Sequence, residues 1–306
     1  MRLDGRRESS NIEDRRGRSV GGGNILGNMI NISGGGGRSR FGCGTVIVIG
    51  LIYFLMGGDL NGLLQMFGGV EGITPTEQTT ENETYVGTEE EEALALFTRQ
   101  ILASTEDVWE RKFQEMGKIY EAPTLVMYTG QIQTGCGNGS AAMGPFYCSA
   151  DQKVYIDLSF FRDMKKTLGA DGDFAYAYVI AHEVGHHVQY LLGDLGKAHQ
   201  QMARLSSVDA NKISVQIELQ ADFYAGVWGH YENKLFNSLE KGDLEEALVT
   251  AQKIGDDYLQ KKAQGYTNSK TYTHGTSAQR EKWFKKGWIS GNLSQGNTFA
   301  INYNNL

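Results

Sequence analysis

The 306-residue sequence predicts an α+β fold: a small mixed or antiparallel sheet, a mainly helical half, and a single transmembrane helix in front of both. Two short runs rich in β-branched and aromatic residues, 124–130 and 153–159, predict strands. Apolar residues at helical spacing predict helices over most of the chain after residue 159. An uncharged apolar run, 41–58, predicts the membrane helix.

The first segment, residues 1–40, is basic and rich in glycine. Its eight Arg and four acidic residues give it a charge of +4, so the remainder carries −11 because the whole chain carries −7. High charge and flexible backbone predict a disordered tail, whose arginines favour solubility and a cytoplasmic position. The acidic remainder argues against nucleic acid as a partner, since phosphate binding needs clustered cations.

The apolar run 41–58 reaches the length that a membrane-spanning helix needs. A buried core helix would show polar positions at helical spacing, and a signal peptide would begin nearer the N-terminus. Arg38 and Arg40 precede the run, whereas Asp59 and Glu71 follow it. The positive-inside rule then predicts a single-pass protein of the cell membrane, in contact with lipid through 41–58. Its N-terminus would be cytoplasmic, and its main domain periplasmic or extracellular.

Beyond this run we expect an acidic, Thr-rich linker over 59–90 and one folded domain over 91–306. Cys136 and Cys148 bracket a glycine-rich loop in that domain. An oxidising compartment favours a disulfide between them. A zinc pair is the alternative, although the spacing is too long for a Cys-x-x-Cys knuckle and no His lies nearby.

The segment "AHEVGHHVQYLLG", 181–193, predicts a metal site on a helix. His182 and His186 are four residues apart, so both rings project from one face and can bind one zinc ion. Glu183, beside the first ligand, can take a proton from a water molecule at the metal. His187 lies about 100° further round the helix and is interpreted as a packing residue or a support of the ligands.

A zinc hydrolase also needs a third ligand and acceptors for the far N–H groups of its histidines. "IELQADFYAGVW" supplies Glu218, 32 residues after His186, and Asp222 four residues later on the same face. In "THGTSAQREKWF", His274 precedes a helix start and could donate a hydrogen bond to an oxyanion, with Arg280 pairing a carboxylate. Helix capping alone is the competing interpretation of that segment.

These motifs resemble, in order and over nearly the whole chain, the bacterial neutral zinc metallopeptidase family of the YpfJ type. The segments that carry the resemblance are "NIEDRRG", "GCG…GPFYCSADQKVYIDL", "HEVGHHVQ", "ELQADFYAGVW", "IGDDYLQ" and "HGTSAQREKWF". The site is also similar to that of the gluzincins, which implies a zincin-like domain with one zinc per chain. The resemblance implies three ligands, a base, a supporting carboxylate and an oxyanion donor: His182, His186, Glu218, Glu183, Asp222 and His274. Phe223 departs from the pattern, because a small residue or Cys is expected after "QAD".

The sequence thus predicts a membrane-anchored zinc peptidase acting on a peptide or protein. A tethered binding or scaffold module with a structural or vestigial zinc site remains an alternative, as does a zinc amidase acting on a non-peptide substrate. Asp256 and Asp257 could orient a ligand or hold Arg280, or could lie on a plain helix surface. The strand that holds Tyr155 and Ile156 could be the edge to which an extended peptide adds; Tyr155 could instead face the core.

Overall fold

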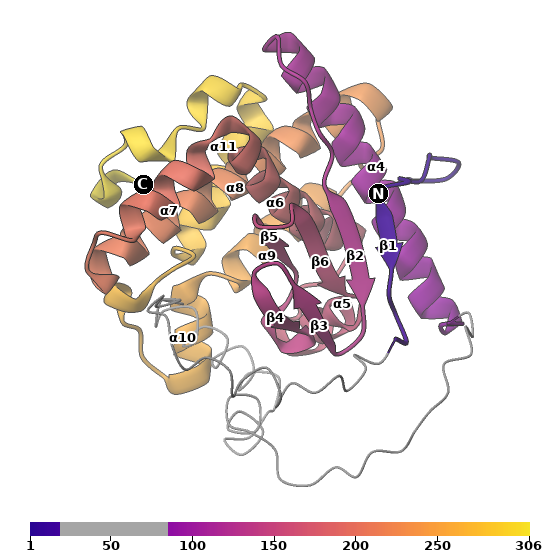
Figure 1. Ribbon diagram of the computed structural model, residues 1–306, viewed down its shortest axis with the longest axis horizontal. Helices are drawn as coiled ribbons and strands as arrows, with labels where there is room; N and C mark the ends of the chain where they lie inside the picture. Colours follow the sequence, from indigo (N-terminus) through magenta and orange to yellow (C-terminus); the bar gives the residue numbers. More distant parts are fainter. Residues whose placement is uncertain (19–84) are drawn as a thin grey trace, which may run out of the picture.

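The computed structural model describes residues 1–18 and 85–306, which form a mixed α/β domain (Figure 1). Its main sheet has the strand order β1-β2-β6-β5. Three strands run parallel, β1 (Ile12–Asp14), β2 (Thr124–Tyr128) and β6 (Lys153–Asp157), while β5 (Phe146–Cys148) is antiparallel to β6. A separate antiparallel hairpin is formed by β3 (Gln131–Thr134) and β4 (Gly137–Ser140).

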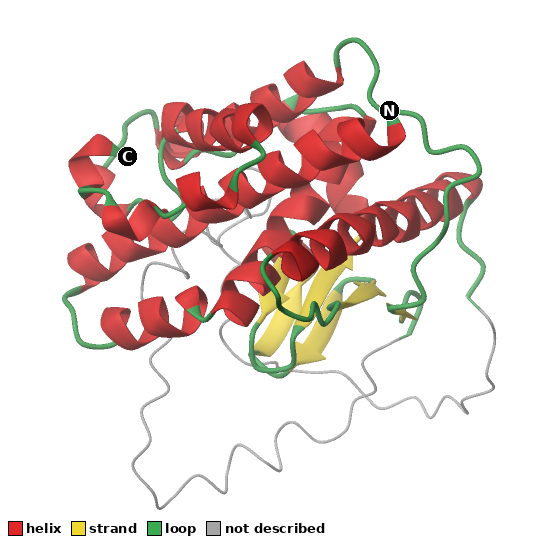
Figure 2. Ribbon diagram, turned by 90° about the horizontal axis from the view of Figure 1, so that it is seen from above, coloured by secondary structure: helices red, strands yellow, loops and turns green. Residues whose placement is uncertain are grey.

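Helices make up the rest of the described domain, and Figure 2 shows them gathered largely to one side of the small sheet. The α-helices are α4 (Glu89–Glu115), α5 (Ser159–Asp163), α6 (Asp173–Leu192), α7 (Asp194–Met202), α8 (Ser207–Phe236), α9 (Asp243–Lys253), α10 (Asp256–Gln264) and α11 (Ser277–Ser290). Short helical turns are η1 (Ala141–Met143), η2 (Met164–Leu168), η3 (Ser269–Thr271), η4 (Leu293–Gln295), η5 (Thr298–Ala300) and η6 (Tyr303–Asn305).

The two faces of the sheet pack into two different cores, as the period of two along a strand requires. On β6, Val154 and Ile156 belong to the large core that the helices share. Tyr155, between them, belongs to a small core on the other face, together with Ile132 of the hairpin and Cys148. The hairpin therefore covers the face of the sheet that the helices do not.

Close approach between helices depends on glycines in α6, α8 and α11. A Cβ atom added at Gly226 of α8 would lie 2.1 Å from the Phe284 carbonyl oxygen of α11. A Cβ atom at Gly287 of α11 would lie 2.1 Å from the carbonyl oxygen of Phe223 in α8. At Gly185 of α6, an added Cβ atom would lie 3.0 Å from the Ala221 carbonyl oxygen of α8. Because these positions lack side chains, α8 can pack tightly against both neighbours.

The expected disorder of residues 1–40 is wrong for residues 1–18, which fold onto the helices and add β1 to the sheet. Arginines of this segment pair with carboxylates that lie far along the chain. Arg6 pairs with the fully buried Glu232 at 2.8 Å, and Arg7 pairs with the buried Glu106 at 2.8 Å. The charge that suggested a solvated tail is thus partly neutralised inside the fold, while residues 19–40 lie outside the described residues.

The predicted fold class is wrong in its single transmembrane helix. Ile12 of β1 is registered with Leu125 of β2 in one parallel pair, whereas a single crossing at 41–58 would separate the two strands by a membrane. Within residues 1–18 and 85–306, no helix combines the length and apolarity that spanning a bilayer requires. The run 41–58 itself lies outside the described residues. In the described structure, β1 and β2 therefore belong to one folded domain.

The strand that holds Tyr155 and Ile156 is not an edge. It is β6, which pairs with β2 on one side and with β5 on the other. The edge of the sheet nearest to α6 is instead β5, a three-residue strand that the sequence did not identify.

Candidate metal centre

Three side chains with metal-binding atoms converge where α6 meets α8. His182, His186 and Glu218 each offer one ligand atom, and these atoms lie within 4.8 Å of one another. The His182 Nε2 atom is 3.1 Å from one Glu218 carboxylate oxygen, and the His186 Nε2 atom is 3.6 Å from the other. Both His side chains and the carboxylate are largely shielded from solvent. The three residues thus form one compact site.

Local structure explains the convergence. The two histidines are one helical turn apart on α6, so their rings lie side by side with centroids 4.8 Å apart. Between them, Gly185 lets the backbone of α8 approach α6 at Ala221, three residues after Glu218. The short distance between the helices allows a glutamate side chain to reach both rings.

Asp222 lies one turn after Glu218 and holds the first histidine ring from behind. The His182 Nδ1–H donates to the Asp222 carboxylate at 2.9 Å. The same buried carboxylate accepts from the Tyr178 hydroxyl at 2.5 Å and from the Arg280 guanidinium at 2.8 and 2.9 Å. These contacts fix the orientation of the His182 ring, so its Nε2 atom faces Glu218 and is the atom that a metal ion would use.

The second histidine ring is fixed in the same way by an amide. The Gln189 side-chain amide donates to the Ile217 carbonyl oxygen at 2.7 Å and to the Gln220 side chain at 2.9 Å. Its oxygen is therefore turned toward His186 Nδ1, 2.9 Å away, and accepts the proton there. The Nε2 lone pair of His186 is left to face the centre of the site.

The donor set fits a divalent ion of the zinc type. Two neutral imidazole nitrogens and one carboxylate oxygen are ligands that zinc prefers, and both rings carry acceptors on their far nitrogens. Three protein ligands would leave a further coordination position for water or substrate, as in catalytic rather than structural zinc sites. The residues present therefore suit a metal ion with room for water or substrate.

Without a metal ion, burial and the neighbouring charges shift the pKa values of the side chains in the site. Burial alone would raise the pKa of Glu218, but the rings of His274, His186 and His182 bring it well below its usual range. Burial would lower the pKa of His182, yet Asp222 and Glu218 raise it to about 10. Burial lowers the pKa of His186 to about 4. A proton on His182 Nε2 then lies between the ring and the ionised Glu218 carboxylate, where a metal ion would bind.

Glu183 lies beside the ligands but is not one of them. Its side chain is buried, and no hydrogen bond within residues 1–18 and 85–306 holds its carboxylate. Burial raises the pKa of Glu183 to about 7, an effect that the charges of His182 and His274 oppose and that of Glu218 reinforces. A carboxyl group with a pKa near neutrality can both accept and return a proton.

His274 lies near the same centre on a loop before α11. Asp256, at the start of α10, accepts hydrogen bonds from three consecutive backbone N–H groups of that loop, those of Thr273, His274 and Gly275, at 2.7–3.0 Å. Burial would lower the pKa of the half-buried His274 ring, but Glu218 and Asp256 raise it. The loop thus fixes the His274 backbone, and the charge of Glu218 is near enough to raise the pKa of its ring.

The remaining predicted residues fall into place around this centre. Arg280 is buried and pairs with Asp222, not with the acidic pair of α10. Asp257 accepts from the Ser277 backbone N–H at 2.7 Å, so it fastens the start of α11. That start carries a capping box formed by Thr276 and Gln279. The start of α11 is therefore capped within the same segment that supplies Arg280 to the site.

Sequence reasoning missed Tyr178 and Gln189. Tyr178 precedes His182 by four residues and Gln189 follows His186 by three, so helical spacing alone placed both on the ligand face. Phe223, the departure from the family pattern, is fully buried and packs against Trp283 and Tyr224.

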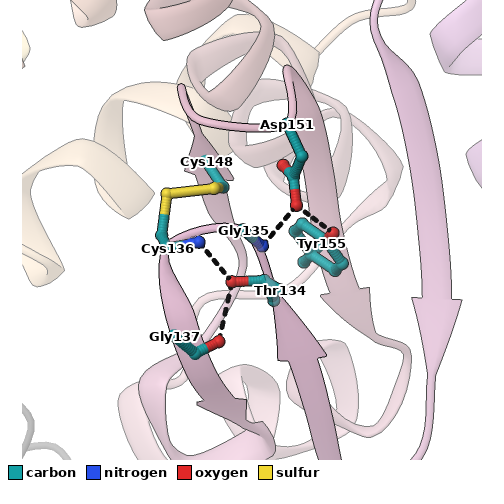
Figure 3. The surroundings of a disulfide bond; sticks show 7 residues. All are labelled: Thr134, Gly135, Cys136, Gly137, Cys148, Asp151 and Tyr155. Atoms are coloured by element: carbon teal, nitrogen blue, oxygen red, sulfur yellow. Dashed lines mark hydrogen bonds between the residues drawn. A yellow bond between two sulfur atoms is a disulfide. The ribbon is translucent and has the colours of Figure 1, made fainter.

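Cys136 and Cys148 form a disulfide that joins the tip of the β3–β4 hairpin to β5 (Figure 3). Beside it, the Asp151 carboxylate accepts from the Gly135 backbone N–H and from the Tyr155 hydroxyl, both at 2.7 Å. The hairpin tip is therefore attached to the β5–β6 region by one covalent and one polar contact.

Comparison with known proteins agrees with the motif order. Residues 1–299 match the model of the family described as "Putative neutral zinc metallopeptidase", and the chain belongs to that family. It is 50% identical to "Uncharacterized protein YpfJ" of Escherichia coli K12 over 302 residues, covering 98% of this chain and 99% of that protein. It is 41% identical over 191 residues to "Uncharacterized protein Mb2605" of Mycobacterium bovis, covering 59% and 64% respectively. No solved structure matches the chain.

Proposed function

We propose that this member of the neutral zinc metallopeptidase family is a zinc-dependent peptidase that hydrolyses internal peptide bonds of a peptide or protein. One observation carries the proposal: two imidazole nitrogens and one carboxylate oxygen lie within 4.8 Å, with the unpaired carboxylate of Glu183 beside them. A structural zinc site would gain nothing from such a group. The family description supports the same chemistry.

His182, His186 and Glu218 would hold the single zinc ion. When bound there, zinc supplies a Lewis acid that lowers the pKa of water and polarises a carbonyl group. Asp222 and Gln189 keep the two rings in the orientation that binding requires. Tyr178 and Arg280 in turn hold Asp222.

Glu183 would act as the general base. Its carboxylate takes a proton from the attacking water and then passes that proton to the departing amine nitrogen. In the metal-free site, burial raises the pKa of Glu183, so its carboxylate takes up a proton more readily than an exposed carboxylate does.

His274 would stabilise the oxyanion that forms when water adds to the peptide carbonyl. Asp256 orients the loop through its three backbone contacts, and the Thr273 hydroxyl and Asp256 lie near the ring Nδ1 atom. The Nε2–H group then remains to donate to substrate.

Substrate would bind as an extended strand along β5. In the described part of the chain, no strand pairs with the edge of β5 opposite to β6. Backbone N–H and C=O groups of an edge strand can pair with an added chain. This strand contacts α6 directly, through Tyr147 and His187, next to the ligand His186.

The test uses the full-length protein loaded with zinc and a mixed peptide library. The wild type should bind one zinc per chain and cleave peptides, and a chelator should abolish cleavage. Glu183→Gln should retain zinc and lose activity by about a hundredfold or more, the scale of general acid–base catalysis. Glu245→Gln, at an exposed position on α9, is the matched control and should behave like the wild type.

Zinc binding without cleavage by the wild type would favour the scaffold alternative. Cleavage of a non-peptide amide alone would favour the amidase. Cleavage undiminished in Glu183→Gln would remove Glu183 from the mechanism. The disulfide between Cys136 and Cys148 supports placing the domain in an oxidising compartment, while lipid contact through 41–58 stays a prediction.

A further inference from the structure

The edge strand β5 is only three residues long, yet each of its side chains is attached to a different part of the domain. Phe146 stacks on Tyr155 of β6 with ring centroids 5.1 Å apart. Cys148 is bonded to Cys136 at the hairpin tip (Figure 3). Tyr147 projects to the opposite face, toward the helices, and its hydroxyl lies 3.0 Å from the His187 Nδ1 atom.

Of these three attachments, only that of Tyr147 reaches the helix that carries the metal-binding histidines. His187 follows the ligand His186 directly on α6. Its Nε2 atom lies 2.6 Å from the Glu121 carbonyl oxygen, so Nε2 carries the proton and donates it there. Nδ1 is therefore an acceptor, and the Tyr147 hydroxyl donates to it.

The ring of His187 is also enclosed by aromatic side chains. Tyr147 and Tyr120 meet it edge-on, with centroids at 5.4 and 6.0 Å. The His187 side chain is nearly inaccessible to solvent, with 1% exposed. Its two hydrogen bonds and tight packing leave it no freedom to rotate, so it forms a rigid link between α6, β5 and the segment before β2.

We infer that Tyr147 and His187 are positioning residues that set the distance between the substrate-binding edge of β5 and the metal-binding face of α6. This inference rests on the proposed peptidase function, because it needs a peptide paired with β5. In an antiparallel pair the backbone groups of successive residues point alternately toward the partner and away from it. A strand of three residues therefore offers few outward groups, and a small shift of β5 displaces them all relative to the metal ion.

The chain offers matched variants. Tyr147→Phe removes only the donor of the Tyr147–His187 bond. In His187→Gln, the amide can imitate Nε2 and keep the bond to Glu121, but it loses the acceptor for Tyr147. In His187→Asn, the side-chain oxygen can imitate Nδ1 and keep the bond to β5. Tyr190→Phe is the control, since the Tyr190 hydroxyl makes no hydrogen bond within the described chain and its ring lies beside Tyr147.

The experiment compares cleavage of an extended decapeptide with cleavage of a blocked dipeptide too short to pair along β5. Each substrate is given to the zinc-loaded full-length variants. Tyr147→Phe and His187→Gln should raise KM for the decapeptide about fivefold, the effect of one lost hydrogen bond, and leave kcat within about twofold. The dipeptide should be unaffected, zinc stoichiometry should remain one, and His187→Asn and Tyr190→Phe should resemble the wild type. Equal losses on both substrates, or loss of zinc, would overturn the inference.

Amide hydrogen exchange at residues 146–148 separates this inference from the proposed function. A wild type that binds zinc but cleaves neither substrate would refute the peptidase proposal. In that case, amide hydrogen exchange alone tests whether Tyr147 and His187 hold β5 to α6. Exchange about fivefold faster in Tyr147→Phe and His187→Gln than in the other two variants would support it, and equal exchange in all four would overturn it.

Discussion

Replacing Asp222 by Asn should weaken both the fold and the metal site, because this carboxylate is the centre of a buried network. Asp222 is 0% exposed and Arg280 is 3% exposed. The carboxylate accepts from the Arg280 guanidinium, the Tyr178 hydroxyl and the His182 ring. Asn has nearly the same shape but no charge. Its side-chain NH2 group would face N–H and O–H donors, which cannot accept a hydrogen bond from it.

The structure sets the size of the effect. Burial would raise the pKa of Asp222, but Arg280 and His182 lower it from 3.8 to about 2. At about 1.4 kcal/mol per pKa unit, the ionised form is stabilised by roughly 2–3 kcal/mol. Leaving the Arg280 charge unpaired in the interior brings the expected loss to about 3–5 kcal/mol. Misorientation of the His182 ring should lower zinc affinity about 10–100-fold.

Two measurements separate these effects. Urea unfolding in the presence of a chelator reports the stability of the metal-free fold, and competition with a chromogenic chelator reports zinc affinity. Arg280→Met is the companion variant, because it leaves Asp222 bonded to His182 and Tyr178. If the buried pair is coupled, Asp222→Asn combined with Arg280→Met should cost less than the two single losses added together.

The pH dependence provides a further check of sign. A carboxyl group whose folded pKa is depressed stabilises the fold above its unfolded pKa and loses that contribution as the pH falls through the folded value. The gap between wild type and Asp222→Asn should therefore be complete above about pH 4 and shrink toward pH 2. A gap independent of pH, or zinc affinity unchanged within twofold, would refute the role assigned to Asp222.

Three further predictions follow from other parts of the fold. Deleting residues 1–18 removes β1 and leaves buried carboxylates without their arginine partners, at a cost of about 3–5 kcal/mol each. The truncated chain should therefore show no cooperative unfolding when it is followed by circular dichroism. A normal unfolding transition would contradict this. In metal-free protein, burial raises the pKa of Glu183 from 4.5 to about 7. The free energy of unfolding of the wild type should therefore fall by roughly 3 kcal/mol relative to that of Glu183→Gln as the pH rises from 4.5 to 7. A difference in urea unfolding that stays constant over this range would contradict the shift. Replacing Cys136 and Cys148 by Ser opens a loop whose ends are 12 residues apart in sequence. The variant should lose about 3 kcal/mol of unfolding free energy and keep its zinc affinity. Wild-type unfolding that is the same with and without reductant would contradict this.

The residues of the metal centre could be predicted because their geometry is mostly local. Spacing of four on one helix puts His182 and His186 on a common face, and the same spacing joins Glu218 to Asp222 on another. The need for a third ligand and for a supporting acceptor could be predicted from the chemistry of a zinc hydrolase. The resemblance to the zinc metallopeptidase family also implied Glu218 as the third ligand.

The N-terminal segment could not be predicted by the same means. β1 is three residues long and pairs with a strand more than a hundred residues away, at Leu125. Composition averaged over 1–40 reports charge and glycine but not which arginine has a buried partner. A fragment starting at residue 91 would lack β1 and is a poor substitute for the whole chain.

The middle and the C-terminal end of one helix, α8, connect these observations. α8 carries Glu218 and Asp222 near its middle and Glu232 one to two turns before its end. Glu232 is fully buried, accepts from Arg6 at 2.8 Å and from the Ser238 hydroxyl at 2.7 Å, and also bonds Ser104 of α4. The helix that presents the third ligand is thus held by α6, α11, α4 and the N-terminal segment together.

This arrangement has a consequence for Arg6, which is far from the metal centre in sequence and touches none of its ligands. Arg6→Met would leave Glu232 buried without its cation, at a cost of about 3–5 kcal/mol. If α8 moves as a rigid body, the variant should also bind zinc more weakly, because Glu218 shifts with the helix. If only the end of α8 unwinds, stability should fall while zinc affinity stays unchanged. Measuring both quantities in Arg6→Met therefore decides whether the N-terminal segment merely stabilises the domain or also maintains the geometry of the ligand helix.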